Sequence, residues 1–333
     1  MARINLLAWD NQRGLTHDIR LLSNALVVLG HEVHVTRLGP HRQDGRWKGH
    51  LLRLRMWWLR LRRGDRRAML YDANIALEHV RPAWFGLARL NLLVPNPEWL
   101  SPRSQQYLKR FDAILCKTQY AGEVFRAHGC RALYIGFRGT DCLDQDIPRQ
   151  PTFLHLAGAS KMKGTQRLLA LWRRHPEWPK LVVLQSPRTA TSLAEPIPCN
   201  IEHRVGYLDD IREIRRLQNS HVFHLCLSET EGWGHYLAEG MSCKAVVVTC
   251  DAPPMNELVS PTRGMLVKAS ETGPFNLATR YRFDDAALEA TIERLMTMSE
   301  NERTLLGEQA RAWFVSNEAA FASRLDAALR QLL

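Results

Sequence analysis

Short apolar runs of strand length alternate with amphipathic helical stretches along this chain. The first run is "INLLAW" (residues 4–9), apolar residues recur at helical spacing from Leu15 to Leu29, and the alternating run "EVHVTRL" (residues 32–38) follows Gly30. Strands that alternate with helices build parallel sheets, because a parallel connection requires a crossover. The sequence therefore predicts an α/β fold.

The alternation occurs in two cycles. Further strand candidates are residues 74–80, 90–95 and 112–117 in the first cycle, and residues 153–158, 180–185, 221–227, 244–249 and 264–269 in the second. A stretch rich in Pro and charge, "DQDIPRQPT" (144–152), separates the cycles, and helical segments run from about Asp284 to Leu333. A chain of 333 residues suits two domains of roughly 150 residues.

We therefore predict two Rossmann-like, doubly wound domains, residues 1–147 and 148–333, with the last helices either in the second domain or packed back on the first. Facing each other, these domains would bind a ligand in a cleft at the carboxyl ends of both sheets.

Composition limits the partners and the compartment. A formal net charge of +11 and a pI near 9.6 favour an anionic partner, namely nucleotide phosphates, nucleic acid or an acidic lipid surface. Seven scattered cysteines without a CxxC pair argue against a disulfide framework or a zinc site. The apolar run before Asp10 is too short for a secretory signal, and no later run is long enough to span a bilayer. We expect a cytoplasmic protein with reduced thiols.

The stretch "SETEGWGHYLAEG" (residues 228–240) places Glu231 and Glu239 on either side of a Gly-Trp-Gly turn. In a parallel domain this turn lies between a strand and a helix starting near His235, so backbone N–H groups and the positive helix end suit a diphosphate. The two carboxylates suit hydroxyl groups. The alternative is a capping Glu231 and a solvated Glu239.

Residues 228–258 resemble the C-terminal signature of retaining glycosyltransferases of family 4, which have the GT-B fold and are often called glycosyl transferases group 1. The matching positions are Glu231 and Glu239 of the E-x7-E motif, Gly232, Trp233 and Gly234 of the Gly-aromatic-Gly turn, and Glu257 after the next strand. "GASKMKG" (158–164) is similar to the Lys-Gly loop of this family, and "IGFRGTD" (135–141) to the segment that closes its first domain.

The resemblance implies that the second domain binds a nucleoside diphosphate sugar. Glu231 would contact hydroxyls of the sugar, Glu239 the paired ribose hydroxyls, and Lys163 the diphosphate, where positive charge offsets the charge developing on the leaving group. Ala159 stands where the family usually has an arginine, and Lys161 is the candidate replacement. The full set of donor-binding candidates is Gly14, Lys161, Gly232, Trp233, Gly234, His235, Tyr236 and Glu239.

In the first domain, Gly14 ends the loop "DNQRG" (10–14), where the family has a glycine-rich turn; a simple helix-start glycine is the alternative. Asn96 stands where the family often has a histidine near the reacting sugar, and Glu98 follows on the acceptor side. A Pro-flanked Asn is also typical of a turn. The Asp-Gln-Asp of residues 144–146 is interpreted as solvated, and we expect neither a metal nor another cofactor.

A basic aromatic segment, residues 42–67, holds ten Lys or Arg and two Asp, a net of +8 out of +11. On a helix at 100° per residue, one face would collect the apolar side chains and the other the arginines. The acceptor or surface candidates here are Arg53, Trp57, Trp58 and Arg60. Three interpretations stay open: a helix packed on the first domain with its arginines in water, an interfacial helix on an anionic membrane, and a basic arm on nucleic acid.

These patterns lead to one main expectation and two alternatives. We expect a glycosyltransferase that moves sugar from a nucleoside diphosphate sugar to an acceptor hydroxyl without a metal, with the anomeric configuration retained as the resemblance implies. The acceptor would be a lipid-linked or cell-surface glycan at an anionic membrane surface. The alternatives are a glycosyltransferase acting on nucleic acid, such as a modified base in DNA, and a non-catalytic nucleotide or glycan binding protein.

Overall fold

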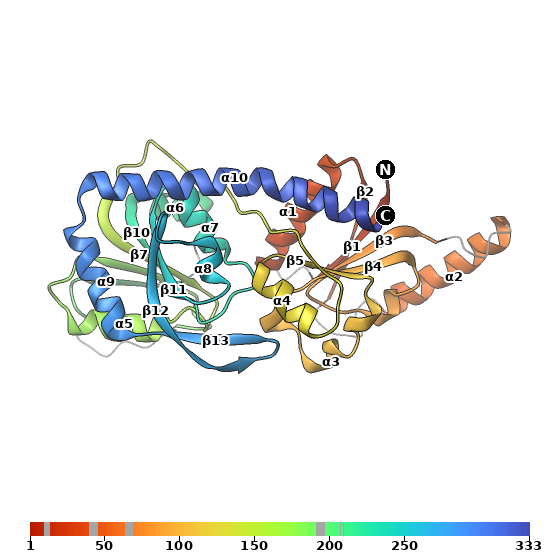
Figure 1. Cartoon of the computed structure of the whole chain (residues 1–333), viewed down its shortest axis with the longest axis horizontal. Helices are drawn as coiled ribbons and strands as arrows, with labels where there is room; N and C mark the ends of the chain where they lie inside the picture. The colour runs from red at the N-terminus through yellow and green to blue at the C-terminus, as the bar shows by residue number, and fades with distance from the viewer. Residues whose placement is uncertain (10–13, 40–45, 64–68, 191–196, 207, 209) are drawn as a thin grey trace. The chain divides into compact units, whose positions relative to one another are not determined.

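Figure 1 shows the computed structural model of the chain, which contains two β-sheets. Each sheet is built mainly from parallel strands. The structure describes all residues except 10–13, 40–45, 64–68, 191–196, 207 and 209. Its contacts divide the chain into unit 1, residues 1–137 with 319–333, and unit 2, residues 138–318. The α/β class predicted from the alternation of strands and helices is confirmed.

Unit 1 contains a six-stranded parallel sheet in the order β2-β1-β3-β4-β5-β6. Its strands are β1 (Arg3–Trp9), β2 (Glu32–Leu38), β3 (Tyr71–Leu77), β4 (Ala88–Val94), β5 (Ala113–Cys116) and β6 (Ala132–Tyr134). Its helices are α1 (Gly14–Val28), α2 (Arg46–Arg63), η1 (Pro82–Trp84), η2 (Pro97–Trp99), α3 (Pro102–Gln105), η3 (Leu108–Arg110) and α4 (Gln119–Ala127). Central residues of β1 and β3 to β5 are buried, as their mainly apolar runs require. The chain order reverses between β1 and β3, which makes that point the topological switch.

Unit 2 contains a seven-stranded sheet in the order β13-β12-β11-β10-β7-β8-β9. Its strands are β7 (Gln150–Gly158), β8 (Leu181–Gln185), β9 (Ile201–Val205), β10 (His221–Cys226), β11 (Val246–Asp251), β12 (Gly264–Phe275) and β13 (Ala278–Phe283). Its helices are α5 (Thr165–Arg174), α6 (Ile211–Ser220), α7 (His235–Ser242), α8 (Met255–Leu258), α9 (Asp285–Thr297) and the first part of α10 (Glu300–Leu332). The strands pair in parallel except for β12 with β13.

The first half of β12 matches the strand predicted at residues 264–269, whereas the second half of β12, β13 and the edge strand β9 have no counterpart among the predicted strands. β12 pairs with β11 over Gly264–Lys268 and then continues as an exposed arm paired with β13. The second half of β12 carries polar residues and two helix-breaking positions rather than an apolar period. Strands at an edge need only one buried face or none, and their sequences therefore carry a weak signal.

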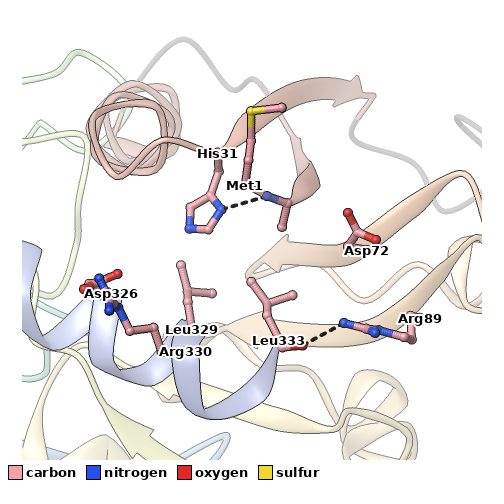
Figure 2. Close-up of a pocket in the computed structure, with 9 residues that line it drawn as sticks. Met1, His31, Asp72, Arg89, Asp326, Leu329, Arg330 and Leu333 are labelled. Atoms are coloured by element: carbon pink, nitrogen blue, oxygen red, sulfur yellow. Dashed lines mark hydrogen bonds and ion pairs between the residues drawn. The ribbon is translucent and has the colours of Figure 1, made fainter.

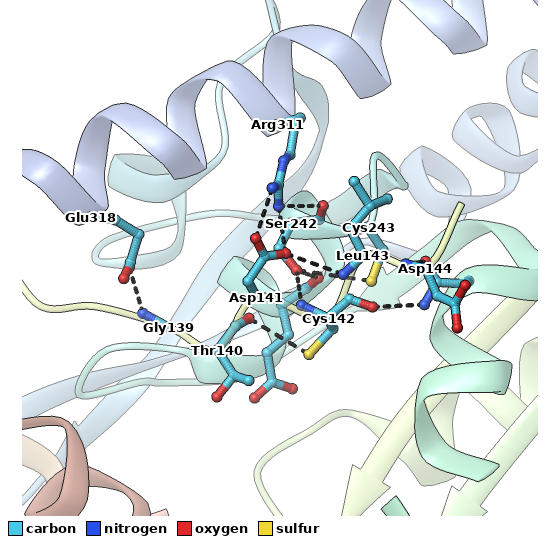
Figure 3. A network of polar contacts seen from close by, with 12 residues as sticks. Gly139, Thr140, Asp141, Cys142, Leu143, Asp144, Ser242, Cys243, Arg311 and Glu318 are labelled. Atoms are coloured by element: carbon cyan, nitrogen blue, oxygen red, sulfur yellow. Dashed lines mark hydrogen bonds and ion pairs between the residues drawn. The ribbon is translucent and has the colours of Figure 1, made fainter. Parts of the chain in front are cut away.

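The boundary between the units lies at residue 137, not at the expected residue 147, because the segment after β6 makes its contacts within unit 2. Figure 3 shows Asp141 in a bidentate ion pair with Arg311 of α10, at 2.6 and 2.7 Å. The backbone N–H of Cys142 donates to Ser242 Oγ at the end of α7, at 3.0 Å. The boundary between the units therefore falls inside the segment "IGFRGTD" (135–141). This segment was predicted to close the first domain, but only its first three residues belong to unit 1.

The last part of α10 belongs to unit 1. Phe321 packs edge-on against Phe137 at a centroid distance of 5.4 Å, and the guanidinium of Arg324 donates to Ile135 O at 3.1 Å. Beside the final turn lies a pocket of about 330 Å³, in which Arg89 donates to Leu333 O at 2.8 Å. Figure 2 shows this pocket between the helix end and the first residues of the chain.

Candidate active site

Two loops of unit 2 meet where β7 and β10 end. The backbone N–H of Glu229, after β10, donates to Met162 O in the loop after β7, at 2.8 Å. Gly164 closes that loop in the left-handed conformation, with φ at 67°, and a Cβ there would lie 2.8 Å from Leu227 O. Only glycine combines this conformation with such a close approach. Backbone packing thereby explains the glycine of the Lys-Gly pair.

Lys163 and Glu231, predicted from separate motifs, form an ion pair in this structure. Only 15% of the Lys163 side chain and 14% of the Glu231 side chain are exposed. Ser228 Oγ donates to the same carboxylate at 2.5 Å and also hydrogen-bonds to the hydroxyl of Tyr236. The ammonium of Lys163 lies over the Tyr236 ring, 3.5 Å from its centroid, where the ring's negative face stabilises it.

The Gly-Trp-Gly turn leads into α7 as predicted. Gly234 is the N-cap residue with φ at 93°, and α7 begins at His235. Gly232 and Trp233 are buried in the turn. The first N–H groups of an α-helix have no acceptor within the helix, so the start of α7 offers donors and a positive dipole end beside Lys163.

Glu239 lies in the second turn of α7, on the same helix as Tyr236. Gln218 Nε2 donates to one of its carboxylate oxygens at 3.0 Å, which orients the carboxyl group. Burial raises the pKa of Glu239, whereas the nearby charge of His235 and the bond from Gln218 lower it. A carboxyl group that is half-buried and already oriented can accept hydrogen bonds from vicinal hydroxyls without losing further side-chain entropy.

Lys161 does not join Lys163 at Glu231 in the contacts of the described residues. Its side chain is exposed and lines a separate pocket of about 330 Å³, together with the start of α5, Glu229 and Arg282. Its proposed role as the replacement for the family's arginine stays a prediction.

The sequence patterns missed Ser228 and a buried histidine under the Lys-Gly loop. His155 of β7 bonds through Nδ1 to Leu225 O at 2.7 Å and through Nε2 to Thr165 Oγ1 at 2.9 Å. Burial lowers its pKa to about 4, so it is neutral at pH 7. His155 therefore joins β7, β10 and the start of α5. A polar residue inside an otherwise apolar strand run was the only available signal.

Unit 1 has its own polar cluster at the carboxyl ends of its strands. Asn96, the predicted catalytic-side residue, donates from Nδ2 to the carboxylate of Glu78, which directly follows β3. Glu78 has a φ of 56°, which is uncommon for a residue with a side chain. Burial raises its pKa to about 7, against the opposing effect of nearby Lys117. Residues 74–80 read as one strand in the sequence, so Glu78 was not predicted as a site residue.

Lys117 and Asp18 form the charged part of this cluster. Lys117 Nζ lies 2.5 Å from Asp18 Oδ2 and 4.7 Å from the Phe137 ring centroid. The two side chains are only 2% and 5% exposed. Trp9 at the end of β1 meets His79 after β3, edge to face with centroids 5.3 Å apart, so these rings span the topological switch point of the sheet.

The remaining predicted residues lie as follows. Glu98 is buried in η2. Gly14 is the first residue of α1, and the rest of its predicted loop, residues 10–13, lies outside the described residues. Glu257 is in α8, after β11. Asp144 and Asp146 are exposed, in agreement with their interpretation as solvated.

The two parallel sheets and the ion-paired site at the start of α7 define a glycosyltransferase of the GT-B fold. The sequence profile described as "Glycosyl transferases group 1" matches residues 145–313, half of the chain, and the chain belongs to that family. The family resemblance found in the sequence is thereby confirmed, and the protein is a glycosyltransferase. No curated protein sequence matches the chain.

Solved structures of the same fold align over the whole chain. A sucrose-phosphate synthase from Thermosynechococcus elongatus aligns with a TM-score of 0.73 and 15% identity, covering 100% of this chain and 99% of that one. A glycosyltransferase from Rickettsia africae aligns with a TM-score of 0.71 and 13% identity, covering 99% and 98%. HepE of Anabaena, solved with UDP and glucose, aligns with a TM-score of 0.67 and 13% identity, covering 100% of both chains. At these identities the likeness establishes the fold alone.

Proposed function

We propose that this glycosyltransferase uses a nucleoside diphosphate sugar as donor and that unit 2 binds it. The ion pair of Lys163 with Glu231 at the start of α7 is the observation that carries the proposal. The loop of Lys163 and the N–H groups of α7 would hold the diphosphate. Glu231 would then exchange its ammonium partner for hydroxyls of the sugar, and Glu239 would hold the ribose hydroxyls. HepE, which has the same fold, was solved with UDP and with UDP-glucose.

The chemistry follows from the charges at this site. As the bond from the anomeric carbon to the diphosphate oxygen breaks, negative charge grows on the leaving phosphate, and a fixed ammonium group stabilises that charge more than it stabilises the ground state. We infer that the configuration is retained, with the leaving phosphate taking the acceptor proton on the face where the acceptor hydroxyl attacks. No metal is required in this proposal, because Lys163 and the helix end supply the positive charge.

For the acceptor we propose a hydroxyl of a lipid-linked or cell-surface glycan. The observation in its favour is the apolar face of α2, whose large side chains are exposed rather than packed on unit 1. Modification of nucleic acid, the alternative acceptor, would use the arginines of α2 but gives no reason for an exposed apolar face.

Ligand-dependent melting tests the donor proposal first. A ligand that binds only the folded protein stabilises it by about 2.7 kcal/mol at a hundredfold excess over its Kd. The expected result is a rise in Tm with one or a few members of a panel of nucleoside diphosphate sugars, and none with free sugars. Hydrolysis or transfer of that donor should then be lost in Glu231→Ala and Lys163→Ala. Unchanged turnover in both variants would refute the site.

The role of Glu239 has a separate readout. If its carboxyl group binds the ribose, the wild type should prefer a ribonucleoside diphosphate over the 2′-deoxy form by roughly 10-fold or more, as a lost hydrogen bond to a charged group predicts. Glu239→Ala should bind both forms equally. A preference that persists in the variant would assign the ribose to another residue.

A further inference from the structure

Helix α2 exposes its apolar face. Leu51, Leu54, Trp57, Trp58 and Leu61 are each between 56% and 63% exposed. At 100° per residue these five positions fall within an arc of about 120°, so they form one continuous stripe along the helix. We call these five side chains the α2 stripe. A contiguous exposed patch of large apolar side chains in a globular domain marks an interaction site or an aggregation liability.

The opposite side of α2 holds the helix on unit 1. Met56 is buried, Leu52 is half-buried, and the guanidinium of Arg53 donates to Phe85 O just after η1, at 3.3 Å. Figure 1 shows α2 extending away from the sheet of unit 1. The interpretation in which α2 packs its tryptophans on the domain and leaves only arginines in water is therefore wrong. The side chain of Arg60 lies outside the described set.

Basic residues border the α2 stripe and no acid interrupts them. Residues 46–63 contain seven Lys or Arg and no Asp or Glu. On the helix, Arg55 and Arg62 fall next to one side of the stripe, and Arg53 falls next to the other. The side chains of these three arginines are exposed. The surface is thus apolar at its centre and positive along both edges.

We propose that α2 lies flat on an anionic lipid surface, with the α2 stripe inserted at the headgroup level and the flanking arginines on lipid phosphates. A helix with an apolar face, Trp side chains and a basic border binds such surfaces through apolar burial and electrostatic attraction together. Tryptophan suits the boundary because its ring is apolar while its N–H stays hydrated. This inference does not depend on the donor proposal, since it uses no residue of the site in unit 2.

Two other occupants of the α2 stripe explain less of the surface. Duplex nucleic acid would engage the arginines through its phosphates but would leave five large apolar side chains in water. A second copy of the chain would bury the stripe, but it would bring two basic borders without acids against each other, and like charges at an interface oppose association. Membrane binding uses both the stripe and its border. Among the described residues no helix is long and apolar enough to cross a bilayer, which a surface-bound helix does not need.

Flotation of the full chain with vesicles tests the proposal. We expect binding to vesicles of phosphatidylcholine mixed with phosphatidylglycerol, and little binding to phosphatidylcholine alone. The double variant Trp57→Ser/Trp58→Ser should lose about 10-fold or more in vesicle affinity, because it removes the largest inserted groups. Arg55→Glu/Arg62→Glu should lose at least as much and should no longer distinguish the two lipid mixtures.

Matched controls separate the stripe from general charge and apolarity. Leu305→Ser replaces a side chain of α10 that is 61% exposed. Arg212→Glu/Arg216→Glu makes the same change of net charge on two exposed residues of α6. Both controls should bind vesicles like the wild type. The Tm of all four variants, measured without ligand, should stay close to that of the wild type, which shows that they fold and keeps this test separate from that of the donor site.

Three results would overturn the proposal. The first is equal binding to both lipid mixtures, or none to either. The second is duplex DNA binding that weakens steeply with salt while vesicle binding is absent. The third is a dimer in light scattering that Trp57→Ser/Trp58→Ser converts to a monomer, since the stripe would then be covered by a second copy.

Discussion

Each sheet has a lysine paired with an acid where its strands end, but the two pairs differ in exposure. In unit 1, Lys117 and Asp18 are 2% and 5% exposed. In unit 2, Lys163 and Glu231 are 15% and 14% exposed, and the carboxylate also accepts from Ser228. A pair that is sealed from solvent cannot exchange partners without exposing a buried charge, whereas a pair at the surface of a site can release each member to a ligand.

This difference in exposure shows that a lysine paired with an acid at the end of a strand does not by itself define a binding site. Lys117 holds Asp18 of α1 against the sheet and lies over the Phe137 ring, so its contacts are internal. Lys163 lies in a loop whose backbone shape is fixed by Gly164, beside the first turn of α7. We therefore expect loss of Lys117 to affect stability and loss of Lys163 to affect the reaction.

The largest effect is expected for Lys117→Met. Removing one member of a buried ion pair leaves an uncompensated charge on the other and costs about 3–5 kcal/mol. Urea unfolding should show this loss. The double variant Lys117→Met/Asp18→Leu should recover much of the stability, because it removes both charges. A single variant as stable as the wild type would show that the pair is not sealed.

Lys163→Ala should change the reaction rather than the fold. Loss of one group that stabilises transition-state charge lowers turnover on the order of 10²- to 10³-fold. The cost in stability should be smaller than for Lys117→Met, because Glu231 keeps its hydrogen bond from Ser228 and is more exposed to solvent than Asp18. Turnover and urea unfolding measured on the same preparation check both statements. If stability falls as far as in Lys117→Met, the contrast between the two pairs disappears.

Gly164→Ala should be more destabilising than Gly30→Ala, although both glycines have positive φ. A Cβ at Gly164 would lie 2.8 Å from Leu227 O, whereas a Cβ at Gly30 would have nothing within 4 Å. Both changes introduce backbone strain of about 1–2 kcal/mol, and crowding at Gly164 adds about 1–3 kcal/mol. Thermal unfolding of the two variants measures the difference. Equal losses would mean that the Lys-Gly loop can shift away from β10.

The stability of the protein should also depend on pH through Glu78. The pKa of Glu78 is raised to about 7, above the value near 4.5 of an unfolded chain, so the folded state binds its proton more tightly. Its contribution to stability is therefore greatest below pH 4.5 and is lost as the pH rises to 7. The free energy of unfolding of the wild type should fall across this range relative to Glu78→Gln. Parallel curves for the two proteins would contradict the raised pKa.

The sequence predicted the fold well, for physical reasons, whereas the binding roles of the unit 2 residues stay predictions. Buried parallel strands carry mainly apolar runs, and the spacing of Glu231 and Glu239 follows from a turn entering a helix, so the local pattern was informative. His155 was missed because its role depends on a contact with the neighbouring strand β10. Ser228 was missed because its bonds to Glu231 and Tyr236 depend on how the turn before α7 folds. Glu78 was missed because it directly follows an apolar strand run, and nothing in the sequence indicated its left-handed backbone conformation. The boundary near residue 137 depended on Asp141 and Arg311, which are far apart in the chain.

Unit 1 is assembled from two separated stretches of chain, and this affects how it can form during synthesis. Phe321, Leu325 and Leu329 of α10 are buried, yet a ribosome makes them only after the whole of unit 2. Until α10 is made, part of the apolar surface of the first 137 residues is therefore exposed to solvent. Chaperones would bind such a partly folded state. For the same reason, a fragment that stops before residue 319 would lack the side chains of α10 that complete the core of unit 1.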